Sequence, residues 1–129
     1  MNDLTAEWVE KAEDDYRVAL RESRVTDGPS FDATCFHAQQ CIEKYAKAFL
    51  QERDIAFVYT HDMVYLHSKC SAADPEFGRY QSDFEQLDEY SVDIRYPGDS
   101  AAESDARAAV AIALRLREFL RGKLGLGEG

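Results

Sequence analysis

The fold is decided by residues 31–49, which read FDATCFHAQQCIEKYAKAF. Within this stretch, apolar residues recur at alternating spacings of four and three: Phe31, Cys35, Ala38, Ile42, Tyr45 and Phe49. Such spacing keeps one apolar stripe along a helix, so it predicts a long helix that is central to the core. The stretch follows the turn signals Gly28 and Pro29, and Ser30 is a suitable N-cap for the helix.

Outward from this stretch, a helical period recurs in four more segments: residues 5–23, 60–70, 76–90 and 100–122. The three prolines, at positions 29, 75 and 97, fall between periodic segments, where helices stop or start. We expect Thr60 to cap the helix that it begins, and Ser100 to form a capping box with Glu103. The predicted fold class is all-α: an up-and-down antiparallel helical bundle of four long helices plus one short helix.

The length of the chain favours one domain. At 129 residues it is near the commonest single-domain size, so we expect residues 1–129 to form a single helical domain. The ordered core is expected over residues 5–122, and the glycine-rich tail, residues 123–129, is expected to fray. Residues 55–59 are β-prone, but a lone strand has no partner, which predicts an apolar loop packed on the bundle.

The composition excludes several classes of protein. With 31% charged and 45% hydrophobic residues, the chain resembles neither a disordered nor a membrane-spanning protein, and its acidic start lacks the pattern of a secretory signal. We therefore expect a cytoplasmic protein with no membrane contact. A net charge of −10 disfavours nonspecific DNA binding, which depends on many Lys and Arg residues. The charge still permits a local basic site, a basic partner or a symmetric dimer.

The first candidate site is a polar row in the central helix. His37, Gln40, Lys44 and Lys47 step by three, four and three, which places them side by side next to the apolar stripe. One hypothesis makes this row a ligand-facing ridge. The alternative is a solvated outer face with a histidine that packs between helices, because such rows are ordinary on amphipathic helices.

The second candidate site is the loop before the last helix, residues 93–99, which read DIRYPGD. Arg95 sets a planar, permanently charged guanidinium beside the ring of Tyr96 and a rigid turn. That combination suits recognition of a phosphate or a base. Alternatively, Arg95 forms a structural ion pair with an acidic neighbour, Asp93 or Asp99.

The histidines and cysteines do not predict a metal site. His61 and His67 are six residues apart, which does not place them on one helical face, and His37 with Cys41 lacks a third ligand in the sequence. The three cysteines form no CxxC pair, so we expect reduced core residues. Glycine-rich phosphate loops and nucleophile motifs are also absent from the sequence, and no cofactor is expected.

Four stretches of the sequence, taken in order, resemble the HEPN domain family: WVEKAEDD at 8–15, CFHAQQCIEKYAK at 35–47, THD at 60–62 and RYP at 95–97. The resemblance covers roughly residues 5–121. It implies a mostly antiparallel helical bundle that forms a homodimer. Small stand-alone members are often encoded beside a minimal nucleotidyltransferase, as a two-component module of toxin–antitoxin type, and family members are associated with nucleotide or RNA binding.

The same resemblance raises the question of catalysis. Many members of the family are metal-independent ribonucleases that use an Arg followed after four to six residues by a His, near the start of the last helix. Here the corresponding positions after Arg95 hold Ser100, Ala101 and Ala102, and no histidine follows His67. Ser and Ala cannot move a proton as an imidazole does near neutral pH, so we do not expect the family's cleavage chemistry.

The resulting hypothesis is a non-catalytic half of a nucleotidyltransferase–HEPN module, with a nucleotide or RNA contact at a dimer cleft. The predicted ligand- or partner-binding residues are Arg95, Tyr96, His37, Gln40, Lys44, Lys47 and His61. Two alternatives stay open: a metal-independent ribonuclease with His37 or His61 as a non-standard catalytic residue, and a purely structural dimerisation module. Large aromatic residues, Trp8 and Phe77 among them, outnumber what a small bundle needs inside, which also favours a homodimer.

Overall fold

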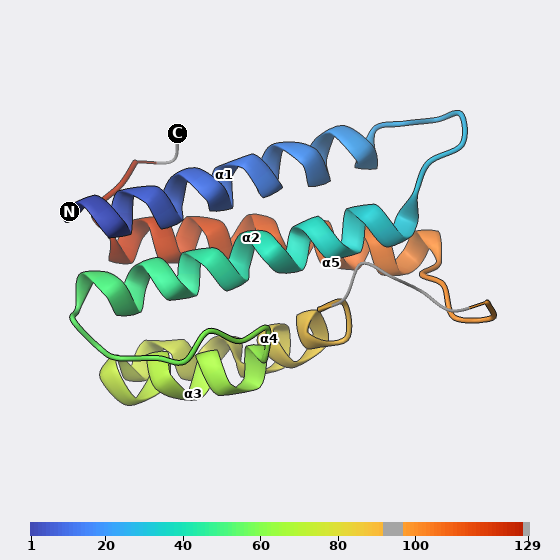
Figure 1. The fold of residues 1–129 in the computed structure, drawn as a ribbon. Coiled ribbons are helices and arrows are strands. Elements are labelled where there is room, and N and C mark those ends of the chain that lie inside the picture. The colour runs from blue at the N-terminus through green and yellow to red at the C-terminus, as the bar shows by residue number, and fades with distance from the viewer. Residues whose placement is uncertain (92–96, 128–129) are drawn as a thin grey trace.

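The computed structural model describes residues 1–91 and 97–127, and over these residues the chain forms helices and connections without a strand (Figure 1). The elements are α1 (Asp3–Ser23), α2 (Phe31–Glu52), α3 (Met63–Ala73), the 3-10 helix η1 (Pro75–Tyr80), α4 (Gln81–Asp88) and α5 (Glu103–Lys123). The all-α prediction is confirmed. Within the described residues, every helix is too short or too polar to span a lipid bilayer.

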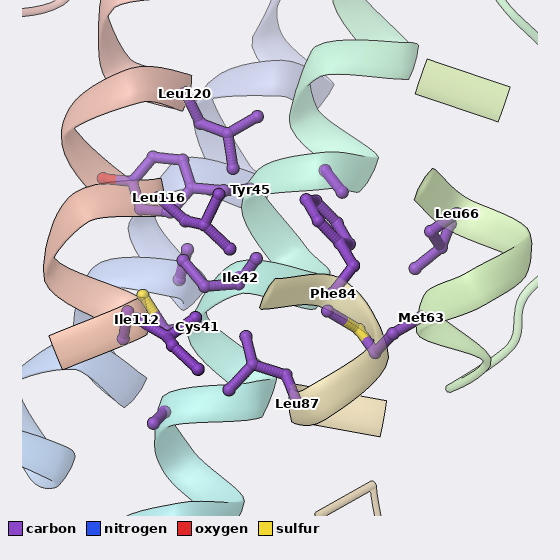
Figure 2. Close-up of a cluster of buried hydrophobic side chains, with 14 of the residues drawn as sticks. Cys41, Ile42, Tyr45, Met63, Leu66, Phe84, Leu87, Ile112, Leu116 and Leu120 are labelled. Carbon is purple, nitrogen blue, oxygen red and sulfur yellow. The ribbon is translucent and has the colours of Figure 1, made fainter. Parts of the chain in front are cut away.

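The helix α2 lies at the centre of the bundle and contacts α1, α3, α4 and α5. Its cap is the predicted one, because the Ser30 hydroxyl accepts a hydrogen bond from the Ala33 N–H at 3.1 Å. Of residues 38–50, all but Lys44 are buried. Side chains of this helix and of its neighbours form the hydrophobic core, shown in Figure 2. The core includes Cys41, Ile42 and Tyr45 of α2, and Met63, Leu66, Phe84, Leu87, Ile112, Leu116 and Leu120 of the other helices.

The connection between α2 and α3 alters the expected alternation of helix directions. Residues 53–62 run back along the bundle, so α3 begins level with the middle of α2 and points the same way (Figure 1). Side-chain contacts show the same alignment of α3 with α2. His61, just before α3, contacts Glu43 in the middle of α2, and Arg53, just after α2, pairs with Asp74, just after α3. The bundle is therefore not strictly up-and-down, because an extended connection replaces a tight turn between these two helices.

The β-prone residues 55–59 belong to this connection and form no strand, as predicted, and Phe57 packs against the core. The predicted cap of the next helix is wrong. Asp62 caps α3, and its carboxylate accepts a hydrogen bond from the Tyr65 N–H at 3.0 Å. The Thr60 hydroxyl accepts from the Asp62 N–H at 3.1 Å instead, so Thr60 shapes the turn before the helix.

The segment that follows Pro75, predicted as a long helix, is divided into η1 and α4. The reason is a side chain from α3: the His67 ring donates from Nε2 to the Phe77 carbonyl at 2.7 Å. In a continuous α-helix, the Gln81 N–H would donate to this same Phe77 carbonyl. Here the Gln81 N–H donates to the Gly78 carbonyl instead, as in a 3-10 helix. The described residues thus form three long helices, α1, α2 and α5, and two shorter ones.

The last helix, α5, begins later than its predicted capping box. Ala102 occupies the cap position, so Ser100 lies outside the helix. The Asp105 carboxylate accepts a hydrogen bond from the Ala102 N–H at 2.8 Å, and this residue takes the back-bonding role predicted for Glu103. α5 runs beside α1 and α2 (Figure 1).

The three cysteines are buried, as predicted. Burial raises the pKa of Cys70 to about 12. Burial, together with the nearby carboxylates of Glu13 and Asp15, also raises the pKa of Cys41. Both thiols therefore stay protonated at neutral pH and behave as small apolar residues of the core.

Candidate functional site

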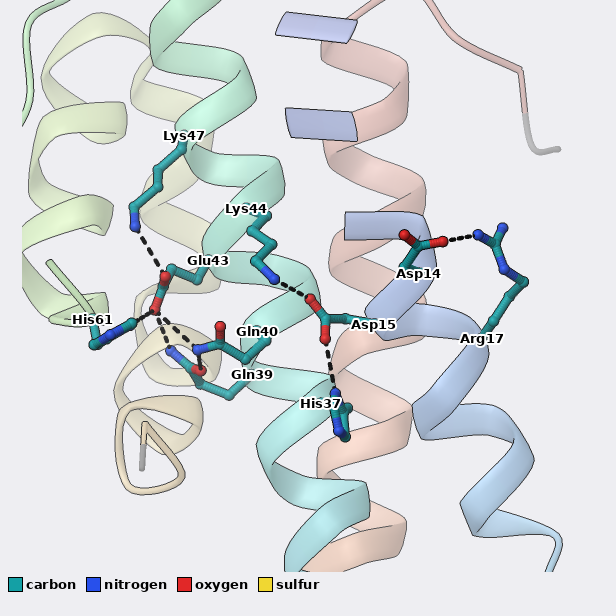
Figure 3. A network of polar contacts seen from close by, with 10 residues as sticks. All are labelled: Asp14, Asp15, Arg17, His37, Gln39, Gln40, Glu43, Lys44, Lys47 and His61. Atoms are coloured by element: carbon teal, nitrogen blue, oxygen red, sulfur yellow. Dashed lines mark hydrogen bonds and ion pairs between the residues drawn. The ribbon is translucent and has the colours of Figure 1, made fainter. Parts of the chain in front are cut away.

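Two of the seven predicted site residues, Arg95 and Tyr96, lie outside the residues that the structure describes. Of the other five, four come from the row on α2, and His61 comes from the connection between α2 and α3. Figure 3 shows that these five side chains gather around two carboxylates, Glu43 and Asp15.

Glu43 is the centre of the first group. Its Oε2 accepts from Lys47 Nζ, one turn later, at 2.9 Å. Its Oε1 accepts from His61 Nδ1 at 2.9 Å and from Gln39 Nε2 at 3.0 Å. The Gln40 amide donates to the same oxygen at 3.4 Å and to Gln39 Oε1 at 2.7 Å. Because four donor groups meet at this one carboxylate, Glu43 holds its neighbours in position.

The ion pair in this group is buried. The side chains of Glu43 and Lys47 are 2% and 6% exposed, and the ammonium lies 5.3 Å from the centre of the Trp8 ring. A charge at such a position is tolerated only when it is paired and hydrogen-bonded, and Trp8 adds a cation–π contact. A ligand could therefore reach Lys47 only if its surroundings opened.

His61 is the exposed member of the first group, with 66% of its side chain accessible. A carboxylate only accepts hydrogen bonds, so the contact between His61 Nδ1 and Glu43 requires the hydrogen on Nδ1. In the neutral ring, Nε2 is then the basic nitrogen. This geometry gives the molecule an oriented imidazole at its surface.

Asp15 of α1 is the centre of the second group. Its two oxygens accept from His37 Nδ1 at 2.8 Å and from Lys44 Nζ at 2.5 Å. The Asp15 side chain is 10% exposed, whereas His37 and Lys44 are 29% and 23% exposed. The contacts bridge α1 and α2 and leave an accessible edge on both donors.

The polar row on α2 is thus neither a solvated face nor a single ridge. Gln40 and Lys47 share Glu43, and the other two members share Asp15 (Figure 3). The sequence reasoning missed both carboxylates. A signal existed for Glu43, which lies four residues before Lys47, the spacing of an ion pair within a helix. A binding role for the row stays a prediction.

Comparison with known proteins identifies the family of the chain. The model of the HEPN domain matches residues 5–123, which contain both carboxylate groups. The chain belongs to the HEPN domain family. The crystal structure of TT1696 from Thermus thermophilus is similar in fold, with 23% identity, a TM-score of 0.73, and coverage of 95% of this chain and 99% of that one. ST0689, an archaeal HEPN homologue, shows 24% identity, a TM-score of 0.74, and coverage of 93% and 97%. A search of curated proteins finds no match.

A third carboxylate of this HEPN domain, Glu13, joins α1 to α5. Arg117 donates to it through two parallel bonds, from Nε at 2.7 Å and from Nη2 at 2.8 Å, and the Tyr45 hydroxyl donates to it as well. Burial by itself would raise the pKa of Glu13, but the hydrogen bonds from Arg117 and Tyr45 outweigh it and lower that pKa below its ordinary value. The partners are 104 residues apart, so nothing in the local sequence indicates this contact.

Other features of the HEPN domain bear on ligands. Over residues 1–91 and 97–127, no group of three or more metal-binding side chains comes together. A hollow of about 330 Å³ opens where the end of α1, the start of α2 and α5 meet, and its apolar lining includes Val25, Phe31, Val110 and Leu114. A second hollow, of about 300 Å³, lies beside the connection between α2 and α3.

Proposed function

We propose that this HEPN protein acts by binding and does not cleave RNA. It is the partner of a minimal nucleotidyltransferase in a cytoplasmic two-component module of toxin–antitoxin type, and it contacts a nucleotide or RNA through Arg95 and Tyr96. One observation carries the expectation that the protein binds without cleaving: Ser100, Ala101 and Ala102 stand where ribonucleolytic HEPN proteins place a histidine. Without an imidazole at these positions, the chain lacks the general acid or base that the family uses for proton transfer near neutral pH.

The contacts of the three histidines support this proposal. His37 is bonded to Asp15, and His61 is bonded to Glu43. His67 is 8% exposed and donates to a backbone carbonyl of η1. All three histidines precede α5 in the chain, and His37 and His67 join one element to another, as residues that hold a bundle together do.

We also propose a homodimer, but on different grounds from the number of aromatic residues. Tyr45, Phe49 and Phe77 are fully buried in the monomer, so they are not available to an interface. Val25 and Leu114, in contrast, are 39% and 44% exposed at the rim of the hollow of about 330 Å³. Apolar side chains grouped around a surface hollow favour association, here with a second copy of the chain.

A second candidate function, metal-independent ribonuclease activity, is favoured by the geometry of His61. Its Nδ1 is held by Glu43 and its side chain is 66% exposed, so Nε2 is the nitrogen able to exchange a proton with a substrate. A carboxylate that orients an imidazole in this way is common among general bases. This candidate requires RNA to bind next to His61.

Co-purification tests the leading proposal. The tagged protein would be recovered from its native host, and mass spectrometry would identify bound proteins and nucleotides. We expect a minimal nucleotidyltransferase, with less recovered by Arg95→Ala and an intermediate amount by Arg95→Lys, because an ammonium keeps the charge and loses the planar fork. Rapid cleavage of RNA by the pure protein in chelator, abolished in His61→Ala, would instead establish the second candidate.

A further inference from the structure

Three aromatic rings meet at the surface of the bundle: Trp8 from α1, and Phe57 and Tyr59 from the connection between α2 and α3. The distances between their ring centroids are 6.1 to 6.4 Å. Tyr59 is 83% exposed, the largest value among the exposed apolar residues of the described chain. Single exposed rings are ordinary, but an exposed ring that joins a cluster indicates a contact surface.

A hollow of about 300 Å³ lies beside two of these rings and is lined by Gln51, Asp54, Ile55, Ala56, Phe57 and Tyr59. Asp54, an exposed residue, is one of these lining residues. Among the residues that the structure describes, no basic side chain lies within ion-pairing distance of Asp54; the adjacent Arg53 pairs with Asp74 and covers the Phe49 ring at 4.6 Å. The hollow therefore combines two aromatic lining residues with an exposed aspartate that has no ion pair among the described residues.

The hollow is held in place before any ligand arrives. Its connection is bonded to the bundle at three points: the Ile55 N–H donates to the Leu50 carbonyl at 2.9 Å, the Val58 N–H donates to the Tyr65 hydroxyl at 3.1 Å, and His61 is held by its bond to the α2 carboxylate. Binding to such a site loses little conformational entropy, since the loop is already ordered.

We propose that this hollow binds an arginine side chain presented by a protein partner, with the guanidinium against the Tyr59 ring and paired with Asp54. A guanidinium satisfies both features at once, because its plane stacks on an aromatic face while its N–H groups reach a carboxylate. The net charge of −10 also favours a basic partner. Nucleic acid fits poorly, since its phosphates would be repelled by the negative charge of Asp54.

This inference rests on the proposed function, in which the protein works by holding a partner, and it names the chemistry of one contact. Trp8 is the only tryptophan in the chain and its ring lies 6.2 Å from that of Tyr59, so its fluorescence reports on the hollow. The probes are the peptide acetyl-Gly-Arg-Gly-amide and its citrulline analogue, which keeps the planar shape without the charge.

We expect the arginine peptide to bind roughly three- to thirtyfold more tightly than the citrulline peptide, the sum of an exposed cation–π contact and a surface ion pair. Asp54→Asn and Tyr59→Ala should each remove roughly half of the free energy behind this preference, because each variant deletes one of the two contacts. Asn suits the first variant because Asp54 has a φ of 55°, a left-handed conformation that Asn adopts readily. Glu118→Gln, which removes an exposed carboxylate from α5, is the matched control and should leave the preference unchanged.

Equal binding of both peptides by the wild-type protein, or a preference that Asp54→Asn leaves unchanged, would overturn the inference. So would a stronger change of Trp8 fluorescence with single-stranded oligouridine than with the arginine peptide, which would assign the hollow to nucleic acid. The two proposals fail separately. If Asp54→Asn retains a co-purifying nucleotidyltransferase at the wild-type level, the hollow is not the docking contact, whereas absence of any partner counts against the proposed function alone.

Discussion

Replacing Glu43 with Leu should lower the free energy of unfolding by roughly 3–5 kcal/mol, the usual cost of breaking a buried ion pair from one side. The side chains of Glu43 and Lys47 are 2% and 6% exposed, so the substitution leaves a buried ammonium without its counter-charge. It also removes the acceptor of Gln39. His61 loses the same partner but is 66% exposed and can turn to water, so the orphaned ammonium dominates the loss.

Thermal unfolding followed by far-UV circular dichroism measures this effect. For a domain of this size, 1 kcal/mol corresponds to about 3–5 °C, so Glu43→Leu should lower the melting temperature by roughly 10–20 °C. The control Glu118→Gln, at an exposed position, should change stability by less than about 0.5 kcal/mol. The double variant Glu43→Leu/Lys47→Met should be more stable than Glu43→Leu, because it also removes the orphaned charge.

Two results would refute this reasoning. One is a melting temperature of Glu43→Leu within a few degrees of the wild-type value. The other is a double variant that loses the sum of the two single effects, which would mean that Glu43 and Lys47 do not stabilise each other.

Four further predictions follow from the site and the family. Light scattering should give about twice the monomer mass of 14.6 kDa; a mass of 14.6 kDa over a wide range of concentration would exclude the homodimer. Pure protein should not cleave RNA rapidly in chelator; cleavage that disappears in His37→Ala or His61→Ala would contradict this. Arg95→Ala should weaken nucleotide or partner binding about ten- to hundredfold, which is the contribution of a bidentate charged contact, and should change the melting temperature little. A large drop in melting temperature with unchanged affinity would show that Arg95 has a structural role. Because Arg117 lowers the pKa of Glu13, that carboxylate stabilises the fold above its ordinary pKa of 4.5, and this contribution disappears as the pH falls through the lowered value. The free energies of unfolding of Glu13→Gln and wild type, measured in urea, should therefore differ most at neutral pH and least in acid. A difference that stays constant with pH would contradict this prediction.

The sequence by itself determined the elements of this HEPN domain that depend on local spacing. The period of residues 31–49 predicts the central helix and its buried stripe, because a stripe needs only the regular turn of one helix. Ser30 is an equally local signal, since a cap bonds to an N–H within the same turn. The local pattern did not identify the N-cap of α3, because Thr60 and Asp62 are both suitable capping residues and lie two positions apart.

Only the tertiary structure decided what the polar row of α2 contacts. Lys44 is bonded to Asp15, 29 residues before it, and Glu43 to His61, 18 residues after it. The direction of α3 and the division of η1 from α4 depend in the same way on contacts between elements. Spacing within a helix brings side chains three or four residues apart together, because they stand one turn apart. Contacts between elements depend instead on how the helices pack and how their connections run, which no spacing within a single segment expresses.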